Sequence, residues 1–183
     1  LIETMAGILF VMIFIFFPPV SVQAAFMTVF YLFITCLLLI ITIYDIKHKI
    51  IPDPLVYAFS LIALARLFLS PDFSFIVPSI SDILAGPILA LPFALMWLLS
   101  KGTWMGLGDA KLVLGIGWTL GLIPGVSAIV LAFWIGAIIS VLWMAIVFRK
   151  VKSRYEIPFG PYLILGMYIV LFFGVRVVDL SIL

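Results

Sequence analysis

The segment Thr4–Tyr44 decides the fold, because TMAGILFVMIFIFFPPVSVQAAFMTVFYLFITCLLLIITIY contains no Asp, Glu, Lys or Arg in 41 residues. A second uncharged run, LVLGIGWTLGLIPGVSAIVLAFWIGAIISVLWMAIVF, covers the 37 residues from Leu112 to Phe148. A helix needs only about 20 apolar residues to cross the hydrocarbon core of a bilayer. Each run therefore has room for about two crossings, and the chain is predicted to be a polytopic helical membrane protein.

The overall composition supports the same class. Of the 183 residues, 67% are hydrophobic and 10% are charged, whereas soluble domains average about 45–50% apolar and about 25% charged residues. A water-soluble domain of this size cannot bury so much apolar surface, which excludes a soluble enzyme, a nucleic-acid-binding protein and a disordered segment. The single cysteine, Cys36, lies inside an apolar run, so we expect neither a disulfide nor a cysteine-based metal site. We expect no metal and no cofactor.

Proline and glycine residues divide the apolar runs into helices. We predict one all-α transmembrane bundle over residues 1–183, with Pro87 and Pro92 as kinks inside its fourth helix. Seven helices are expected, at about 4–17, 24–46, 54–69, 82–100, 108–121, 124–148 and 161–178. The fifth helix is too short to span about 30 Å of hydrocarbon at 1.5 Å per residue. Its glycine-rich start is therefore expected at membrane depth, where non-helical backbone must be buried in protein or face a watery cavity.

The placement of lysine and arginine predicts the orientation in the membrane. Positive residues concentrate in the segments after the second, fourth and sixth helices, namely Lys47, Lys49, Lys101, Lys111, Arg149, Lys150, Lys152 and Arg154. The opposite side carries Arg66 and Arg176. Because short cytoplasmic loops are enriched in positive residues, the amino terminus is predicted to be cytoplasmic and the carboxyl terminus to lie outside.

Two of the eight acidic residues stand apart from the others. Asp45 ends an apolar helix, and Asp109 begins another after the turn Gly106-Leu107-Gly108. The predicted topology puts both at the cytoplasmic edge of the membrane. Carboxylates within membranes are costly and tend to face a bundle interior or a wet cavity, so these two are expected to share one polar site. Asp53, which precedes Pro54, is interpreted as a helix N-cap.

Such a pair of carboxyl groups can perform hydrolysis. Two carboxyl groups in one site do not ionise easily together, so one keeps its proton near neutral pH. The ionised group then draws a proton from a water molecule, while the protonated group polarises a peptide carbonyl. A proton-coupled transporter or channel subunit also places carboxylates in a membrane, and the pair alone leaves both functions open.

Three sequence blocks carry a family resemblance that favours the protease. They are YDIKHKIIPD (44–53), GLGDAKL (106–112) and EIPFGPY (156–162). In order and spacing they closely resemble the type IV prepilin peptidases, which are GxGD membrane aspartyl proteases. The resemblance implies a six-helix peptidase core with one additional N-terminal helix. It also implies that Asp45 and Asp109 are the catalytic pair.

The resemblance also implies a substrate and a location. The substrates would be type IV prepilin or pseudopilin precursors, cut at the cytoplasmic face of the bacterial inner membrane between a basic leader and an apolar helix. The full bacterial enzymes carry an upstream Cys-rich, zinc-binding region and also N-methylate the new amino terminus. The first residues here, Leu1 to Gly7, resemble the stretch that follows that region, so we expect either that an upstream segment is missing or that this is a short form. The resemblance therefore extends to the peptidase activity and not to methyl transfer.

Further residues of these blocks are candidates for substrate binding or support of the pair. These are Gly106, Gly108, Lys111, Asp53, Pro158 and Gly160. Lys111 is expected either to steer a substrate carbonyl or simply to anchor the topology, and the Pro158–Pro161 turn either to shape the substrate entrance or only to connect helices. Another group of glycines, at 115, 117, 121 and 125, is predicted to allow close helix packing. His48 is expected to be a solvated neighbour of the surrounding lysines.

Overall fold

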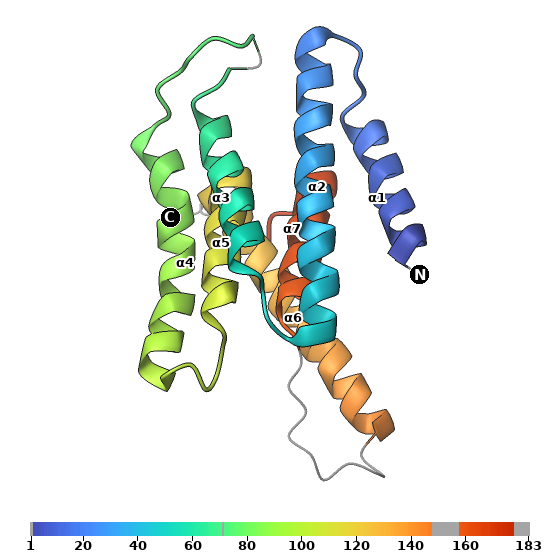
Figure 1. The fold of residues 1–183 in the computed structure, drawn as a ribbon, viewed down its shortest axis with the longest axis vertical. Helices are drawn as coiled ribbons and strands as arrows, with labels where there is room; N and C mark the ends of the chain where they lie inside the picture. Colours follow the sequence, from blue (N-terminus) through green and yellow to red (C-terminus); the bar gives the residue numbers. More distant parts are fainter. Residues whose placement is uncertain (1, 71, 148–157, 178–183) are drawn as a thin grey trace.

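The computed structural model describes residues 2–70, 72–147 and 158–177. Over these ranges the chain forms seven α-helices (Figure 1). Their bounds are α1 Ile2–Phe16, α2 Val22–His48, α3 Asp53–Leu67, α4 Ile80–Ser100, α5 Leu107–Leu120, α6 Leu122–Val147 and α7 Gly160–Phe173. The predicted all-α class is therefore confirmed. Four of the predicted cytoplasmic cations, Arg149, Lys150, Lys152 and Arg154, and the Glu156 of the third sequence block lie outside the described residues.

Most helix bounds differ from the prediction by only a few residues, and α4 runs as a single helix through both Pro87 and Pro92. The clear exception is α7, which ends at Phe173 and not near Val178. Gly174 adopts φ +60° and its N–H donates to the carbonyl of Val170, a left-handed cap that terminates the helix. Apolar composition alone does not reveal such a stop.

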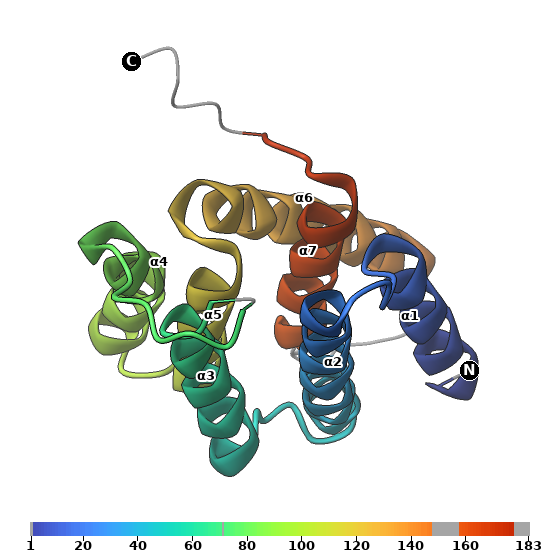
Figure 2. The same cartoon turned by 90° about the horizontal axis from the view of Figure 1, so that it is seen from above.

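The helices form two groups joined by α6 and α7. Seen from above, α3, α4 and α5 cluster on one side, α1 and α2 lie on the other, and α6 runs along the back with α7 between it and α2 (Figure 2). The contacts agree, because α5 packs chiefly on α3 and α4, while α2 packs on α1, α3 and α7. The Tyr168 hydroxyl of α7 donates to Thr35 Oγ1 at 2.8 Å, which ties α7 to α2.

Many large apolar side chains point outward. On α1, Ile8, Val11 and Ile15 are exposed, whereas Ile13 is fully buried. Such a broad apolar surface on a folded protein indicates contact with something other than water. Among the described residues, α2, α4 and residues 122–142 of α6 are long and apolar enough to cross a bilayer. Together with the composition, they make this a membrane protein.

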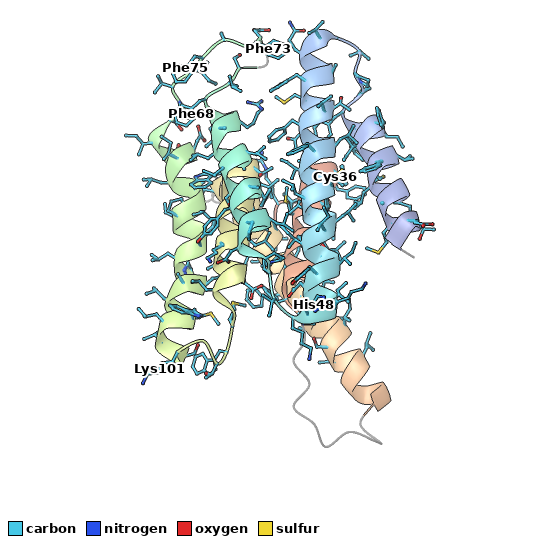
Figure 3. All side chains as sticks on the ribbon, in the orientation of Figure 1. Cys36, His48, Phe68, Phe73, Phe75 and Lys101 are labelled. Carbon is cyan, nitrogen blue, oxygen red and sulfur yellow. The ribbon has the colours of Figure 1, made fainter. Side chains whose placement is uncertain are left out.

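The two ends of the bundle carry different kinds of residue. His48 at the end of α2 and Lys101 after α4 lie at one end, and the aromatic residues of the α3–α4 connection, Phe68, Phe73 and Phe75, lie at the other (Figure 3). Arg66 lies at the aromatic end, where it hydrogen-bonds the carbonyl of Leu69. The described lysines thus share one end, as the sequence pattern predicts.

Small residues let α5 approach its neighbours closely. A Cβ added to Gly117 would lie 2.7 Å from the Cα of Gly86, and one added to Gly86 would lie 2.8 Å from the carbonyl oxygen of Leu114. The Trp118 indole N–H also donates to the carbonyl of Ile83 at 2.8 Å, which ties α5 to α4. The predicted packing role is confirmed for Gly117. Gly115 and Gly125 are likewise covered by side chains, of Phe59 and Leu89 respectively.

The packing prediction is wrong for Gly121. No atom lies within 4 Å of a Cβ built there, and φ is +84°. Gly121 is instead the single residue that separates α5 from α6. Its positive φ is a backbone conformation that residues with an L side chain rarely adopt.

We expect Gly117→Ala to lower the free energy of unfolding by about 1–3 kcal/mol, because overpacking of a tight interface costs that much. Gly7→Ala in α1 is the matched control, since nothing lies within 4 Å of its Cβ. Replacing a helical glycine by alanine in open space should stabilise by about 0.5–1 kcal/mol. Thermal unfolding of the detergent-solubilised variants measures both, and equal effects at the two positions would contradict the close α4–α5 contact.

Candidate active site

A cavity of about 560 Å³ opens at the lysine-bearing end of the bundle. It is bordered by the end of α2, the α2–α3 link, the α4–α5 loop, the start of α5 and the residues before α7. Seven of the eight predicted site residues line it: Asp45, Asp53, Gly106, Gly108, Asp109, Lys111 and Pro158. The eighth, Gly160, touches Asp45 directly. Residues spread over more than 110 positions therefore meet in one place.

Asp45 lies in the last turn of α2 and is only 4% exposed. Its Oδ2 accepts a hydrogen bond from the N–H of Gly160 at 3.1 Å, and its carbonyl accepts one from the N–H of Lys49. Lys49 adopts φ +56° and ends the helix. The acid therefore sits where α2 stops, with its carboxylate against the first residue of α7.

Asp109 lies in the first turn of α5 and is 9% exposed. Gly106 is the N-cap, and the Asp109 N–H donates to its carbonyl at 3.2 Å. Its Oδ2 lies 3.7 Å from the position that a Cβ would take on Gly106, so the carboxylate faces that glycine. An acid in the first turn also faces the positive end of the helix dipole.

The two carboxylates thus have related surroundings. Each lies against a glycine at the start of a helix, Gly160 for Asp45 and Gly106 for Asp109. Helix N-termini offer unpaired N–H groups and a positive partial charge, which favour anions. Two such ends converge on this cavity, and a negative charge formed there is stabilised by both.

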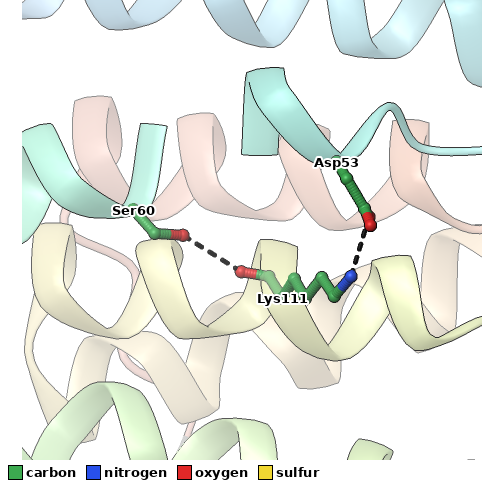
Figure 4. A network of polar contacts seen from close by, with 3 residues as sticks. All are labelled: Asp53, Ser60 and Lys111. Atoms are coloured by element: carbon green, nitrogen blue, oxygen red, sulfur yellow. Dashed lines mark hydrogen bonds and ion pairs between the residues drawn. The ribbon is translucent and has the colours of Figure 1, made fainter. Parts of the chain in front are cut away.

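Asp53 is not an N-cap, so that interpretation is wrong. The N-cap of α3 is Pro52, and Asp53 is the first helical residue. The N–H groups of Leu55 and Val56 bond the Pro52 carbonyl instead. The Asp53 carboxylate is therefore available to Lys111, whose Nζ lies 2.7 Å from Oδ1 (Figure 4).

Lys111 joins α5 to α3 and does not pair with the nearby Asp109. Besides the ion pair with Asp53, its ammonium lies 4.8 Å from the ring centroid of Tyr57. Its carbonyl accepts a hydrogen bond from the Ser60 hydroxyl at 3.2 Å (Figure 4). These contacts, all to α3, fix the start of α5 beside the cavity.

Some residues at the cavity were not predicted. Ile51 is buried between Gly108 and Gly160, and the Phe159 ring packs at a tilt against Phe133, with the ring centroids 4.8 Å apart. Neither carries a charge or a hydrogen-bonding side chain, which is why chemistry-based reasoning passes over them. His48, expected to be solvated, is exposed and packs against the ring of Tyr44. Within the described ranges, no three His, Cys, Asp or Glu residues are grouped so that they could hold a metal ion.

The fold and the cavity define a class: a helical membrane protein in which two buried aspartates from separate helices face one cavity. The chain belongs to the type IV leader peptidase family, whose model matches residues 32–141. It is similar to proteins named prepilin leader peptidase/N-methyltransferase. The Xanthomonas campestris pv. campestris protein is 29% identical over 151 residues, which cover 80% of this chain and 50% of that relative.

Two further relatives bear the same name. The Pseudomonas aeruginosa protein is 32% identical over 153 residues, covering 78% of this chain and 49% of the relative. The Pectobacterium carotovorum subsp. carotovorum protein is 31% identical over 133 residues, covering 70% and 46% respectively. The chain thus spans about half the length of the curated relatives it matches. No solved structure matches it significantly.

A double-mutant cycle tests the Asp53–Lys111 pair. We expect Asp53→Asn, Lys111→Gln and the double variant to give a coupling free energy of about 0.2–1 kcal/mol, because Asp53 is exposed and water screens the pair. Unfolding of the detergent-solubilised protein measures it.

The matched control cycle uses Asp82→Asn and Lys101→Gln. These two exposed residues lie at opposite ends of α4, so their effects should be additive within about 0.3–0.5 kcal/mol. Equal coupling in the two cycles would contradict a specific bond between Asp53 and Lys111.

Proposed function

We propose that this protein is an aspartic endopeptidase that removes the leader peptide from type IV prepilin or pseudopilin precursors at the cytoplasmic face of the bacterial inner membrane. The observation that carries the proposal is the convergence of Asp45 and Asp109 on one cavity in a member of the type IV leader peptidase family. The names of the relatives support leader cleavage. We assign the peptidase activity, and not methyl transfer, to these residues, because a pair of carboxyl groups supplies hydrolytic chemistry.

The chemistry follows from the paired carboxyl groups. With one proton shared between Asp45 and Asp109, the ionised group takes a proton from a water molecule in the cavity as that water attacks the peptide carbonyl. The protonated group keeps its proton and donates a hydrogen bond to the carbonyl oxygen, onto which the negative charge moves as the tetrahedral intermediate forms. The N-termini of α5 and α7 lie beside the two acids, so their dipoles stabilise the negative charge as it moves from the ionised carboxylate to this oxygen. Collapse of the intermediate then requires proton transfer to the leaving amine, for which the newly protonated acid is placed.

The location of the cavity suits a substrate held in the membrane. The cavity lies at the end of the bundle that carries Lys47, Lys49 and Lys101. The enrichment of positive residues in short cytoplasmic loops supports a cytoplasmic position for this end. A precursor with one apolar helix would lie among the outward apolar faces of the bundle and present the peptide just before that helix to the two acids. Gly106 and Gly108 form one part of the cavity wall, and Pro158 and Phe159 form another.

We expect Asp45→Asn and Asp109→Asn each to reduce leader cleavage by about 10²–10⁴-fold, because each removes one of the two groups that transfer protons. Asp53→Asn should stay within about tenfold of the wild type, since Asp53 pairs with Lys111 and not with either acid. Detergent-solubilised protein incubated with a prepilin peptide and analysed by mass spectrometry measures the rates.

Asp82→Asn, far from the cavity at the start of α4, is the matched control and should cleave normally. Wild-type rates in both Asp45→Asn and Asp109→Asn would remove these residues from the mechanism. A wild-type protein that leaves the peptide intact would contradict the peptidase and favour the alternative, a proton-coupled transporter or channel subunit that uses the same carboxylates.

The proposed orientation predicts which loops face the cytoplasm. In a Cys36→Ser background, Val20→Cys in the α1–α2 connection should react with a membrane-impermeant maleimide on intact cells. Lys101→Cys should react only after the cells are permeabilised. Both parent side chains are exposed, so access is limited by the membrane alone. The Cys36→Ser protein without a new cysteine controls for background labelling, and the reverse pattern would overturn the orientation.

A further inference from the structure

The helices that carry the two acids have little contact with each other. Asp45 belongs to α2, which packs on α1, α3 and α7, whereas Asp109 belongs to α5, which packs chiefly on α3 and α4. Proton transfer through one water requires the two carboxyl groups to stand at a defined spacing. Some other part of the chain must therefore hold the end of α2 and the start of α5 apart by a fixed distance.

Ile51 occupies the position where such a spacer is needed. It lies in the link Lys49–Pro52 between α2 and α3 and is only 7% exposed, although the link borders an open cavity. A Cβ built on Gly108 would lie 2.8 Å from the Cβ of Ile51. One built on Gly160 would lie 3.3 Å from its Cδ1. The side chain thus fills the space between these two glycines.

Both glycines are adjacent to the acids. Gly108 directly precedes Asp109 in the chain, and the Gly160 N–H donates to the Asp45 carboxylate at 3.1 Å. One side chain therefore contacts the backbone that holds each acid. A β-branched side chain suits this position, because Ile has fewer accessible χ1 rotamers than an unbranched residue and so forms a stiffer spacer.

We propose that Ile51 is a positioning residue that sets the separation of Asp45 and Asp109 by standing between Gly108 and Gly160. The proposal rests on the function proposed above. It assigns to an apolar residue a role in the geometry of the reaction, without contact to the reacting atoms.

The first test measures cleavage kinetics. Ile51→Ala should lower kcat about 10–100-fold, since a misplacement of about 1 Å can cost on the order of 10²-fold, and KM should change less than about threefold. Ile51→Val keeps the branched Cβ against Gly108 but lacks the Cδ1 that reaches Gly160, so its kcat should fall between those of the wild type and Ile51→Ala. Ile46→Ala is the matched control, because Ile46 follows Asp45 directly but is 57% exposed. Equal kcat for Ile51→Ala and Ile46→Ala would overturn the proposal.

The second test measures the spacing without using activity. Asp45→Cys and Asp109→Cys are combined in the Cys36→Ser background and treated with bifunctional thiol reagents of increasing length. With Ile51 present, one reagent length should cross-link best. Ile51→Ala should shift or broaden this optimum, and Ile46→Ala should not. An unchanged optimum would overturn the role of Ile51 even if the peptidase assignment holds, whereas an inactive wild type would overturn only the peptidase.

Discussion

Two carboxylates buried at the end of an apolar bundle must obtain their polar partners from the protein itself. Burying a charged group without such partners is costly, and here a glycine N–H serves Asp45 across 115 positions of sequence. This one hydrogen bond requires α7 to begin beside the end of α2. It also requires that position 160 carry no side chain, since a Cβ there would lie 2.7 Å from the carboxylate oxygen it serves. The packing of α7 against α2 meets this requirement.

The second acid depends on close packing. α5 is a short helix whose glycines face three different neighbours: Ile51 at Gly108, Phe59 at Gly115 and α4 at Gly117. Each small residue lets α5 approach a partner helix or side chain more closely. The ion pair between Lys111 and Asp53 holds the start of α5 against α3. The position of Asp109 is thus determined along the whole length of α5, including by contacts two or three turns away from the cavity.

The sequence predicts what depends on composition and local chemistry. The long uncharged runs define the helices, and the isolated acids Asp45 and Asp109, with the glycines around them, indicate where a polar site would form. The partner of Asp53, the end of α7 and the function of Gly121 are not predictable in this way. An aspartate that caps a helix, forms an ion pair or is only solvated has the same local sequence. For Asp53, only the position of Lys111 on another helix distinguishes these three roles. Ile51 is hidden for a related reason: its importance depends on which atoms face it and not on its own chemistry.

The modest length of α3 and α5 has a consequence for the surrounding lipid. Fifteen and fourteen residues correspond to about 21–23 Å of helix, while α2 has 27 residues, long enough to exceed a hydrocarbon core of about 30 Å. The helices α3 and α5 are therefore shorter than the hydrocarbon core, although α4 beside them is long enough to cross it. Hydrophobic mismatch of this kind is relieved by local thinning of the membrane. Thinning beside α3 and α5 would bring headgroups and water toward the two acids from the side, so that the proposed hydrolysis would need no continuous channel through the protein.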